Sequence, residues 1–471
     1  MSGNRKTELI KNTIIIALGQ ICTKFLWMLI LPVYTQVLKP EEFGLFDLYS
    51  TYWMLLGFII FLQAEQGIFR FLIEAEENKT EQKAIISTGF WGVLFNSIVF
   101  SAVFVLVGFF VNDPYQYYLL AITLASSWSG FLLQICRGLG DNKTYAVGGV
   151  ICAAINLLCN VIFVFWLRIG VSGLFYGAFF GNLVCVMFIV FAKRLWNYVR
   201  FCSINKVILR HLLKYCFPLI PNSISWWCVY ASDRSITAVM LGTAANGALA
   251  VASRFSTILS SVYNMFHLSW VESASRHIHD SDAERYFFDV INVFFRFFFS
   301  LFIIVLPIFS LCFSYIIGQG YEESYALFPM YLVAAMLNVV QGLYSVVYIA
   351  QKETKELAKS TVISAVVNVL VYIVLIKTCG LLAAGLSTAI AYAVVTIWRY
   401  FDVQKYIRVR LERKLLISAS AVSVIVLYVY YMKSFTENIM LLMIMIFYAI
   451  FINRKTILRM LNKIYRKTVT S

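Results

Sequence analysis

The sequence has few charged residues for its length and lacks three common motifs for nucleotide binding, metal binding and nucleophilic catalysis. Only 13% of its 471 residues are Asp, Glu, Lys or Arg, whereas roughly a quarter of the residues of a soluble domain are charged. There is no GxxxxGK[ST] loop for ATP, no HExxH metal motif and no GxSxG nucleophile elbow. The composition therefore excludes an ordinary soluble domain, and the sequence carries none of these three kinds of site.

The sequence also lacks a cysteine or histidine pattern typical of metal sites or disulfides. The ten cysteines form no CxxC pair and lie mostly inside apolar runs, which is typical of small core residues. Of four histidines, His277 and His279 precede Asp280 in a charged segment that we interpret as a solvated loop. The net charge of +15 comes from basic residues in short loops between apolar runs. This pattern favours anchoring at a membrane surface over binding to nucleic acid.

Apolar residues dominate the chain, at 61% of the composition with a mean hydropathy of +0.78. About 20 apolar residues in a helix cross a bilayer core of roughly 30 Å. The apolar runs are too long for barrel strands, so they predict an all-α integral membrane protein. We expect about fourteen transmembrane helices, near residues 12–38, 43–71, 84–111, 115–137, 144–167, 171–191, 218–241, 246–270, 287–316, 325–350, 360–377, 381–400, 415–432 and 439–452.

The distribution of Lys and Arg predicts the orientation of these helices. Nearly all of them lie in alternate loops and at the two ends of the chain. The opposite set of loops holds only Lys39, Arg168, Lys377 and Lys433. Because basic loops stay in the cytoplasm, we expect both termini there, which requires an even number of helices.

A weak internal repeat predicts two similar halves. Residues Leu38, Gly44 and Ser50 recur as Leu241, Gly247 and Ser253, and the glycines at 170 and 380 precede the sixth and twelfth predicted helices. Glycine-rich turns also recur by chance. If the repeat is real, the N-terminal lobe is 1–200 and the C-terminal lobe is 201–402, which opens with an amphipathic interfacial linker helix near 204–215. Residues 403–471 then form helices 13 and 14 and a basic cytoplasmic tail.

Ionisable residues inside the predicted helices are candidates for function, because each costs roughly 2.5 to 3.5 kcal/mol to insert. The cations are Lys24, Arg234, Arg254 and Arg296, and they outnumber the deep acids Glu65 and Asp233, with Asp47 nearer a helix end. Helical spacing places Gln20 beside Lys24, aligns Arg254 with Thr257, Ser261 and Asn264, and aligns Asp47 with Glu65 if their helix is straight.

A cavity lined by several cations attracts an anion such as a phosphate or diphosphate. The alternative is that each cation pairs structurally, as Arg254 could with Asp233, or reaches an interface. For Arg234, which is next to Asp233, pairing explains the residue as well as substrate contact does. For Arg296 the structural interpretation is slightly favoured.

Several blocks resemble the polysaccharide-repeat-unit flippase family, which includes O-antigen flippases and belongs to the multidrug/oligosaccharidyl-lipid/polysaccharide exporter superfamily. They are KYCFPLIPNSISWW at 214–227, SDR at 232–234 and LGTAANG at 241–247. The beginning of the chain is also similar, with LPVYT at 31–35 and EFG at 42–44 followed by Asp47.

The resemblance implies a V-shaped bundle of two six-helix lobes plus two C-terminal helices. Its implied function is alternating-access transport of an undecaprenyl-diphosphate-linked oligosaccharide from the cytoplasmic to the outer leaflet of a bacterial inner membrane, for O-antigen or capsule. Lys24, Arg234 and Arg254 match the cationic cavity of such flippases, and we add Arg296, Gln20, Asn222 and Asn264 as substrate-binding candidates.

The resemblance further implies coupling to a proton or sodium gradient and no cofactor or metal. Candidates for the coupling acid are Glu65, Asp47 and Asp233, in that order. Expected partners are membrane lipids and the polymerase and other proteins of the pathway, but no nucleic acid. Two alternatives are an exporter of another small solute, of the multidrug type, and a membrane glycosyltransferase or polymerase of the same pathway. The short predicted outer loops argue against the enzyme.

Overall fold

The structure is a computed structural model that describes residues 30–199 and 204–469. All regular secondary structure in these ranges is helical, which confirms the all-α prediction. Eleven of the described helices are long and apolar enough to cross a membrane. Helices α10 (Leu219–Met240) and α11 (Thr243–His277) are not among them, because polar and ionisable side chains occur along both. The predicted count of fourteen stays a prediction, since most of the first predicted helix lies outside the described residues.

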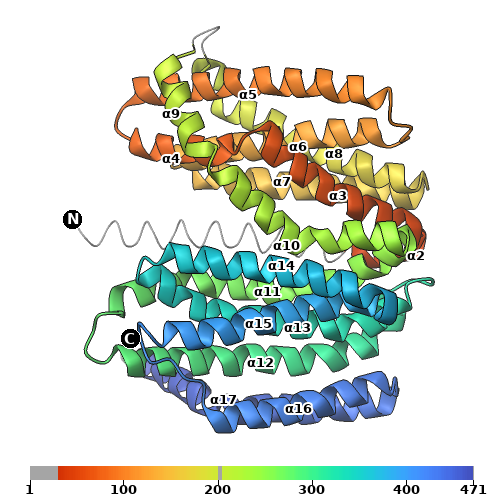
Figure 1. The fold of residues 1–471 in the computed structure, drawn as a ribbon, viewed down its shortest axis with the longest axis vertical. Helices are drawn as coiled ribbons and strands as arrows, with labels where there is room; N and C mark the ends of the chain where they lie inside the picture. Colours follow the sequence, from red (N-terminus) through yellow and green to blue (C-terminus); the bar gives the residue numbers. More distant parts are fainter. Residues whose placement is uncertain (1–29, 200–203, 470–471) are drawn as a thin grey trace. The chain divides into compact units, whose positions relative to one another are not determined.

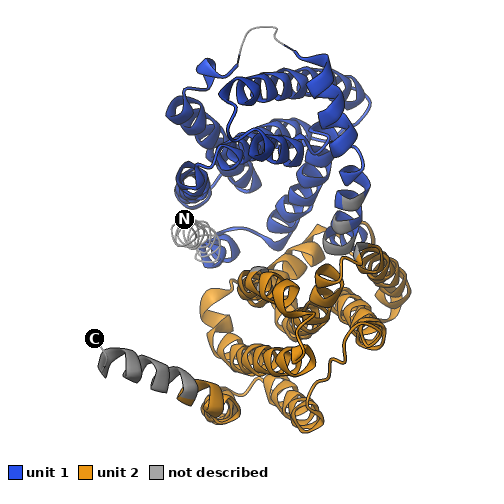
Figure 2. Ribbon diagram, turned by 90° about the vertical axis from the view of Figure 1, so that its left-hand side faces the viewer, with its two compact units in different colours: residues 1–238 blue, residues 239–471 orange. Residues whose placement is uncertain are grey.

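The chain forms two compact units, residues 1–238 and 239–471 (Figure 2). In the described part of unit 1 the helices follow one another through short turns (Figure 1). They are α2 (Leu31–Val37), α3 (Pro40–Ile60), α4 (Ala64–Glu74), α5 (Lys79–Gly108), α6 (Gln116–Gly138), α7 (Asn142–Asn160) with a π-helical extension η1 (Val161–Trp166), α8 (Val171–Lys193), the short η2 (Leu195–Asn197), α9 (Lys206–Cys216) and α10.

Polar residues determine where several of these helices begin. The side chain of Asn78 accepts hydrogen bonds from the backbone of Thr80 and Glu81 at the start of α5. At the start of α3, Glu42 accepts the backbone N–H of Lys39 at 3.0 Å. These contacts satisfy N–H groups that the first turn of a helix leaves without a partner. The EFG motif at 42–44 is thus explained in part by helix capping, with Phe43 buried beside it.

Unit 1 packs its helices closely through small residues. Its apolar core includes Ile68 and Leu72 of α4 and Phe131 of α6, all fully buried. A Cβ atom at Gly138 would lie 2.8 Å from Cβ of Leu72, so only glycine allows α6 to approach α4 this closely. Such contacts are typical of membrane helices, whose association depends on close packing.

The second predicted helix is not straight, and this corrects one premise of the sequence analysis. Helix α3 ends at Ile60 and α4 begins at Ala64. Leu62 and Gln63 between them have φ of +48° and +58°, in the left-handed region. The argument that five whole turns align Asp47 with Glu65 therefore does not hold, because the break separates their helical segments.

The predicted linker helix is present as α9, which lies against α4 and α5 (Figure 1). Its buried side carries Leu212 and Cys216, and the ring of Tyr215 lies 6.0 Å from that of Phe71. Lys206 and Lys214 are exposed. The expected amphipathic pattern is therefore only partly reflected in burial, because Val207 and Tyr215 of the apolar face are exposed. The role of this helix as an interfacial linker stays a prediction.

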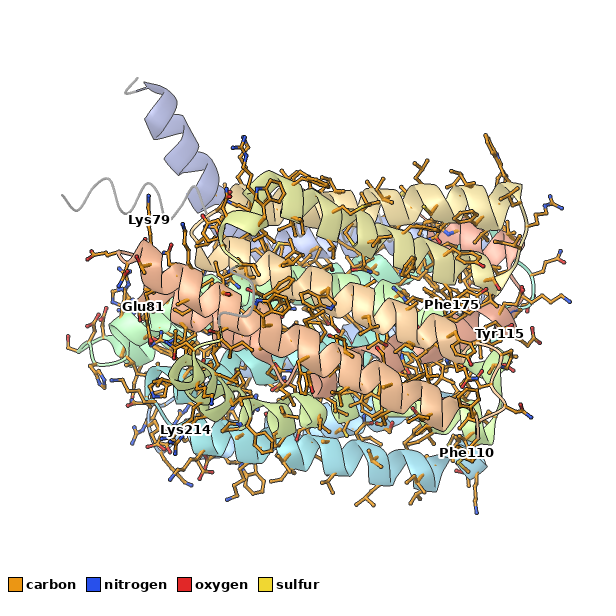
Figure 3. The ribbon with its side chains drawn as sticks, turned by 90° about the horizontal axis from the view of Figure 1, so that it is seen from above. Lys79, Glu81, Phe110, Tyr115, Phe175 and Lys214 are labelled. Carbon is orange, nitrogen blue, oxygen red and sulfur yellow. The ribbon has the colours of Figure 1, made fainter. Side chains whose placement is uncertain are left out.

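The two ends of the helices of unit 1 differ in chemistry. Lys79, Glu81 and Lys214 lie at one end, while Phe110, Tyr115 and Phe175 lie toward the other (Figure 3). This arrangement places the charged loops that were assigned to the cytoplasm together. The orientation itself stays a prediction.

The described part of unit 2 is built from the long helices α11 to α17 (Figure 1). Helix α12 packs against α13 and against the C-terminal pair α16 and α17, while α13 also packs between α11 and α15. Besides α11 they are α12 (Ala283–Ile316), α13 (Glu323–Ala350), α14 (Thr354–Cys379), α15 (Leu382–Val403), α16 (Arg413–Tyr431) and α17 (Phe435–Val469).

Aromatic contacts hold the C-terminal helices to the rest of unit 2. The rings of Tyr325 in α13 and Tyr430 in α16 are stacked with centroids 4.3 Å apart. Each hydroxyl donates to the other residue's carbonyl oxygen, at 2.8 and 2.7 Å. Because the two residues are 105 positions apart, this reciprocal pair connects α16 to α13 directly.

Two glycines of the proposed repeat have matching conformations. Gly170 before α8 has φ 64° and ψ −144°, and Gly380 before α15 has φ 55° and ψ −135°. Only glycine adopts this region readily, so the same turn precedes both helices. The compact units divide after residue 238, which groups α9 with unit 1. The lobe boundaries near 200 and 402 concern the repeat and stay a prediction.

Candidate functional site

Arg234 of α10 lies between two carboxylates of unit 1. Its Nε donates to Oδ2 of Asp47 at 3.0 Å, and its Nη1 donates to Oδ1 of Asp233 at 2.8 Å. The side chains of Asp47 and Asp233 are only 5% and 6% exposed, and that of Arg234 is 15% exposed. Three of the ten predicted site residues therefore form one buried ionic cluster. Asp47 and Arg234 are 187 positions apart in the sequence.

The cluster joins α10 to α3. A second contact between these helices is made by Trp227, whose Nε1 donates to the carbonyl oxygen of Thr51 at 2.8 Å. Asp47 and Thr51 are one helical turn apart on α3, and Trp227 and Arg234 are two turns apart on α10. The two bonds therefore hold the helices together along one edge.

The chemistry of the cluster depends on charge in a low-dielectric setting. Charge-assisted hydrogen bonds are among the strongest that side chains make, and a low-dielectric surrounding strengthens them. A cation that binds to either carboxylate weakens the corresponding bond to Arg234. The cluster therefore links α10 to α3 through charged groups.

Glu65 lies apart from this cluster, in the first turn of α4 just after the helix break. Its carboxylate lies close to Gly130 of α6: a Cβ atom added to Gly130 would be 3.6 Å from Oε2 of Glu65. Among the described residues no hydrogen bond or ion pair to Glu65 is present. An acid next to a broken helix is an arrangement that transporters use for ion sites.

Arg254 belongs to unit 2, in the continuous helix α11, so its predicted helical stripe with Thr257, Ser261 and Asn264 exists. Arg254 is partly exposed, Thr257 and Asn264 are exposed, and Ser261 is buried. The hydroxyl of Thr257 donates to the carbonyl oxygen of Ser253 at 2.8 Å. The role of this stripe in binding stays a prediction.

Arg296 of α12 is paired. Its Nη2 lies 2.5 Å from Oε2 of Glu412, which immediately precedes α16. This contact agrees with the structural interpretation that the sequence slightly favoured. The side chains of Lys24, Gln20 and Asn222 lie outside the described residues, and their predicted roles stay predictions.

One buried cation escaped the sequence analysis. Arg399 of α15 is 4% exposed, and its guanidinium donates to the Gln341 side chain, to Oγ of Ser360 at 2.9 and 3.0 Å and to Oγ1 of Thr361 at 3.2 Å. It is not among the deep cations named from the sequence, because it lies next to the basic loop that follows α15. Its position one residue before the end of the predicted helix was the available signal.

The histidines and cysteines of the described residues form neither a metal cluster nor a disulfide. No group of three or more His, Cys, Asp or Glu side chains there could hold a metal ion. The eight described cysteines are free. His277 instead contacts Asp280 at 2.6 Å, in the exposed segment after α11.

Comparison with known families identifies the chain. The sequence model of the polysaccharide biosynthesis protein family matches residues 9–271, more than half of the chain. The chain belongs to this family. A comparison with curated proteins finds no match.

Solved structures show the fold of this family member. The lipid II flippase MurJ in an inward closed conformation has a TM-score of 0.69 and 15% identity, over 94% of this chain and 100% of that one. An inward-facing multidrug resistance MATE family transporter of the MOP superfamily has a TM-score of 0.66 and 16% identity, over 81% and 95%. A MOP superfamily transporter from Pyrococcus furiosus has a TM-score of 0.58 and 14% identity, over 85% and 96%. The chain thus shares the fold of these solved structures, and its eleven long apolar helices among the described residues support a multi-pass membrane protein.

Proposed function

We propose that this family member is a flippase that moves an undecaprenyl-diphosphate-linked oligosaccharide from the cytoplasmic to the outer leaflet of a bacterial inner membrane. The observation that carries the proposal is membership of the polysaccharide biosynthesis protein family combined with the fold of a lipid II flippase. Polysaccharide repeat units are assembled on a lipid carrier, so a transporter fold in this family calls for a lipid-linked sugar as cargo. The product serves an O-antigen or a capsule, and the polymerase of the pathway acts next.

The cargo's diphosphate is assigned to the deep cations. Arg254 presents a partly exposed guanidinium on a helix whose neighbouring positions carry hydroxyl and amide groups. Lys24 and Gln20, with Asn222 and Asn264, are proposed to complete the polar lining. Arg296 is a weaker candidate, because Glu412 already holds its guanidinium.

Transport is proposed to be driven by a proton or sodium gradient. Asp47 and Asp233 support this step because both contact Arg234, so cation binding to either one alters the link between α3 and α10. Glu65 supports it differently, as an acid at a helix break with no partner among the described residues. Binding of a proton or a sodium ion to one of these acids would accompany the change from inward-open to outward-open states.

The first test uses a strain that lacks the gene. Without the protein, lipid-linked repeat units should accumulate on the inner leaflet and surface polysaccharide should disappear. Wild type should restore the polysaccharide, whereas Lys24→Ala and Arg254→Ala should not, although both proteins insert at normal levels. Arg276→Ala is the matched control for Arg254→Ala, because Arg276 lies on the same helix in an exposed pair with Glu272. Normal polysaccharide in the Arg254→Ala and Lys24→Ala strains would contradict the assigned cation roles.

A second candidate function is export of another small solute, since the fold is shared with MATE family multidrug transporters. The deletion strain distinguishes the two. An exporter of drugs predicts increased drug sensitivity with unchanged surface polysaccharide. Outer-leaflet accumulation of lipid-linked repeats would instead indicate a polymerase.

A further inference from the structure

Unit 2 contains a long groove between α12, α13, α15 and α16. Its volume is about 1160 Å³. Most of its walls are aromatic and aliphatic, among them Phe295, Phe299, Met336, Leu416 and Leu427. The groove lies wholly within this unit and is distinct from the Asp47, Asp233 and Arg234 cluster of unit 1.

The groove is long enough for a lipid chain. Its lining on α16 extends from Arg413 to Leu427, which is roughly 21 Å at the rise of an α-helix. One leaflet of a bilayer contributes about half of a hydrocarbon core of roughly 30 Å. An acyl chain that begins at the level of Arg413 therefore fits within the groove. Exposed apolar side chains at its border, such as Ile397 and Phe401, suit contact with lipid.

Two arginines lie at one end of the groove. Arg410 and Arg413 both line it and are exposed. Within the described residues neither side chain forms an ion pair or a hydrogen bond. The third charged residue of the lining, Glu412, is already paired with Arg296 at 2.5 Å. This end of the groove, which we call its mouth, is therefore cationic. It lies in one of the basic loops that the positive-inside rule assigns to the cytoplasm.

The loop that carries these arginines is held in place. Asn292 of α12 is 4% exposed, and its amide donates to the carbonyl oxygen of Arg410 at 3.2 Å and accepts the backbone N–H of Glu412 at 2.9 Å. Gln404 makes a matching pair of bonds to the backbone of Val409, at 2.6 and 3.2 Å. The mouth is thus ordered before any ligand arrives, which reduces the entropic cost of binding.

We propose that this groove binds an anionic phospholipid of the cytoplasmic leaflet, with its phosphate at Arg410 and Arg413 and one acyl chain between α12 and α16. Charge complementarity selects a lipid with net negative charge, because a zwitterionic headgroup brings its own cation to the arginines. Arg410 and Arg413 form two charge-assisted contacts with phosphate oxygens.

The groove suits a resident lipid better than the carried one. Beyond the mouth the described lining residues include hydroxyl groups, such as those of Thr396, Ser420 and Ser423, but no charged side chain. A diphosphate headgroup that must cross the membrane would find no compensating charge along this path. A phospholipid whose headgroup remains at the arginines needs none. The inference goes beyond the proposed transport function and does not depend on it.

Native mass spectrometry of the full-length protein tests the proposal. Detergent-purified wild type should bind added phosphatidylglycerol at least tenfold more tightly than phosphatidylcholine. Arg410→Gln/Arg413→Gln should reduce binding of phosphatidylglycerol about tenfold, to the level of phosphatidylcholine. The matched control is Arg408→Gln/Lys414→Gln, which removes two exposed charges from the same segment without altering the groove lining, and it should bind as wild type does.

A second pair of variants tests the acyl chain. Ser420→Trp fills the groove and should weaken binding of phosphatidylglycerol, whereas Val424→Trp, at an exposed position outside the lining, should not. Equal affinity of wild type and the Arg410→Gln/Arg413→Gln variant for phosphatidylglycerol would overturn the proposal. So would displacement of phosphatidylglycerol by a lower concentration of undecaprenyl phosphate, because the groove would then belong to the carrier lipid.

Discussion

At the residue scale, Arg234 is the centre of a buried ionic cluster in unit 1. One guanidinium contacts two nearly buried carboxylates, those of Asp47 and Asp233, and the partners come from α3 and α10. Removing one partner of a buried ion pair is costly because it leaves an uncompensated charge in low dielectric. The cluster is therefore sensitive to substitution in a way that exposed pairs are not.

The first prediction is a double-mutant cycle on this cluster. Arg234→Ala should lower the free energy of unfolding by about 3 kcal/mol, since it leaves two buried carboxylates without the guanidinium. Adding Asp47→Asn should recover part of that loss, so the two changes are not additive. Denaturation in mixed detergent micelles measures the cycle. Arg70→Ala, which removes an exposed pair with Glu74, is the control and should cost less than about 1 kcal/mol. Additive costs for Arg234 and Asp47 would show that the contact contributes no coupling.

The second prediction concerns Asp141, which lies outside the membrane-spanning segments at the start of α7. Burial raises the pKa of this carboxyl, but hydrogen bonds from Lys193 and Thr144 outweigh it and lower the pKa to about 2. A carboxyl whose pKa is lowered on folding stabilises the protein above its ordinary value of 3.8, and this contribution is lost as the pH falls toward 2. Asp141→Ala should therefore destabilise by about 1 to 2 kcal/mol at pH 7.

The pH series provides the check on Asp141. The difference in unfolding free energy between wild type and Asp141→Ala should shrink between pH 4 and pH 2, where the wild-type carboxyl becomes protonated. A constant difference across this range would mean that side-chain packing, not charge, explains the effect.

Sequence analysis found the ionisable residues but not their partners. Composition and insertion cost singled out Asp47, Asp233, Arg234 and Arg296, because charges inside apolar runs are conspicuous. Which ones pair depends on contacts between positions as far apart as 187 and 116 residues, which no local pattern contains. Arg399 was missed for a related reason: its proximity to a basic loop concealed that polar side chains of α13 and α14 surround it.

At the element scale, the break between α3 and α4 is the feature that local patterns did not predict. Apolar periodicity continues through residues 61–63, so a single helix was expected. The helix ends because Leu62 and Gln63 adopt left-handed backbone angles, which non-glycine residues rarely do. By contrast, the glycine turns at 170 and 380 were visible in the sequence and have the same conformation in both units.

The third prediction tests this break. Leu62→Ile keeps the side-chain volume but places a β-branched residue at φ of +48°, which should lower the free energy of unfolding by about 1 to 2 kcal/mol. Leu56→Ile, the same change within helical α3, should lower the free energy of unfolding by only a few tenths as much as Leu62→Ile does. Thermal and denaturant unfolding of the two variants provide the comparison. Equal effects at both positions would mean that the left-handed backbone does not contribute.

The fourth prediction links the break to function. Glu65→Gln should abolish the dependence of transport on an ion gradient while leaving the protein folded, if Glu65 is the coupling acid. Glu65→Asp should retain partial dependence, because it keeps the charge. Gradient-driven uptake in vesicles measures this dependence. If it survives in Glu65→Gln but is lost in Asp47→Asn or Asp233→Asn, coupling belongs to one of those two acids instead.

At the scale of the whole molecule, sequence analysis gave the all-α membrane architecture and the family correctly. Both depend on features that errors in individual helix boundaries do not change, namely hydropathy averaged over many residues and several separate motifs. It could not give the grouping of α9 and α10 with unit 1, because that grouping depends on how Leu212, Cys216 and Trp227 pack. The groove of unit 2 likewise forms only when four helices come together.

The central claim is that the protein itself moves a lipid-linked oligosaccharide across a bilayer. The most direct measurement uses purified protein in vesicles loaded with undecaprenyl-diphosphate-linked oligosaccharide, with a membrane-impermeant glycosidase on one side to report each sugar that arrives there. We expect transfer by wild type and by Arg276→Ala, and none above protein-free vesicles by Arg254→Ala. Sugar that stays inaccessible in wild-type vesicles, under a proton gradient and under a sodium gradient alike, would contradict it.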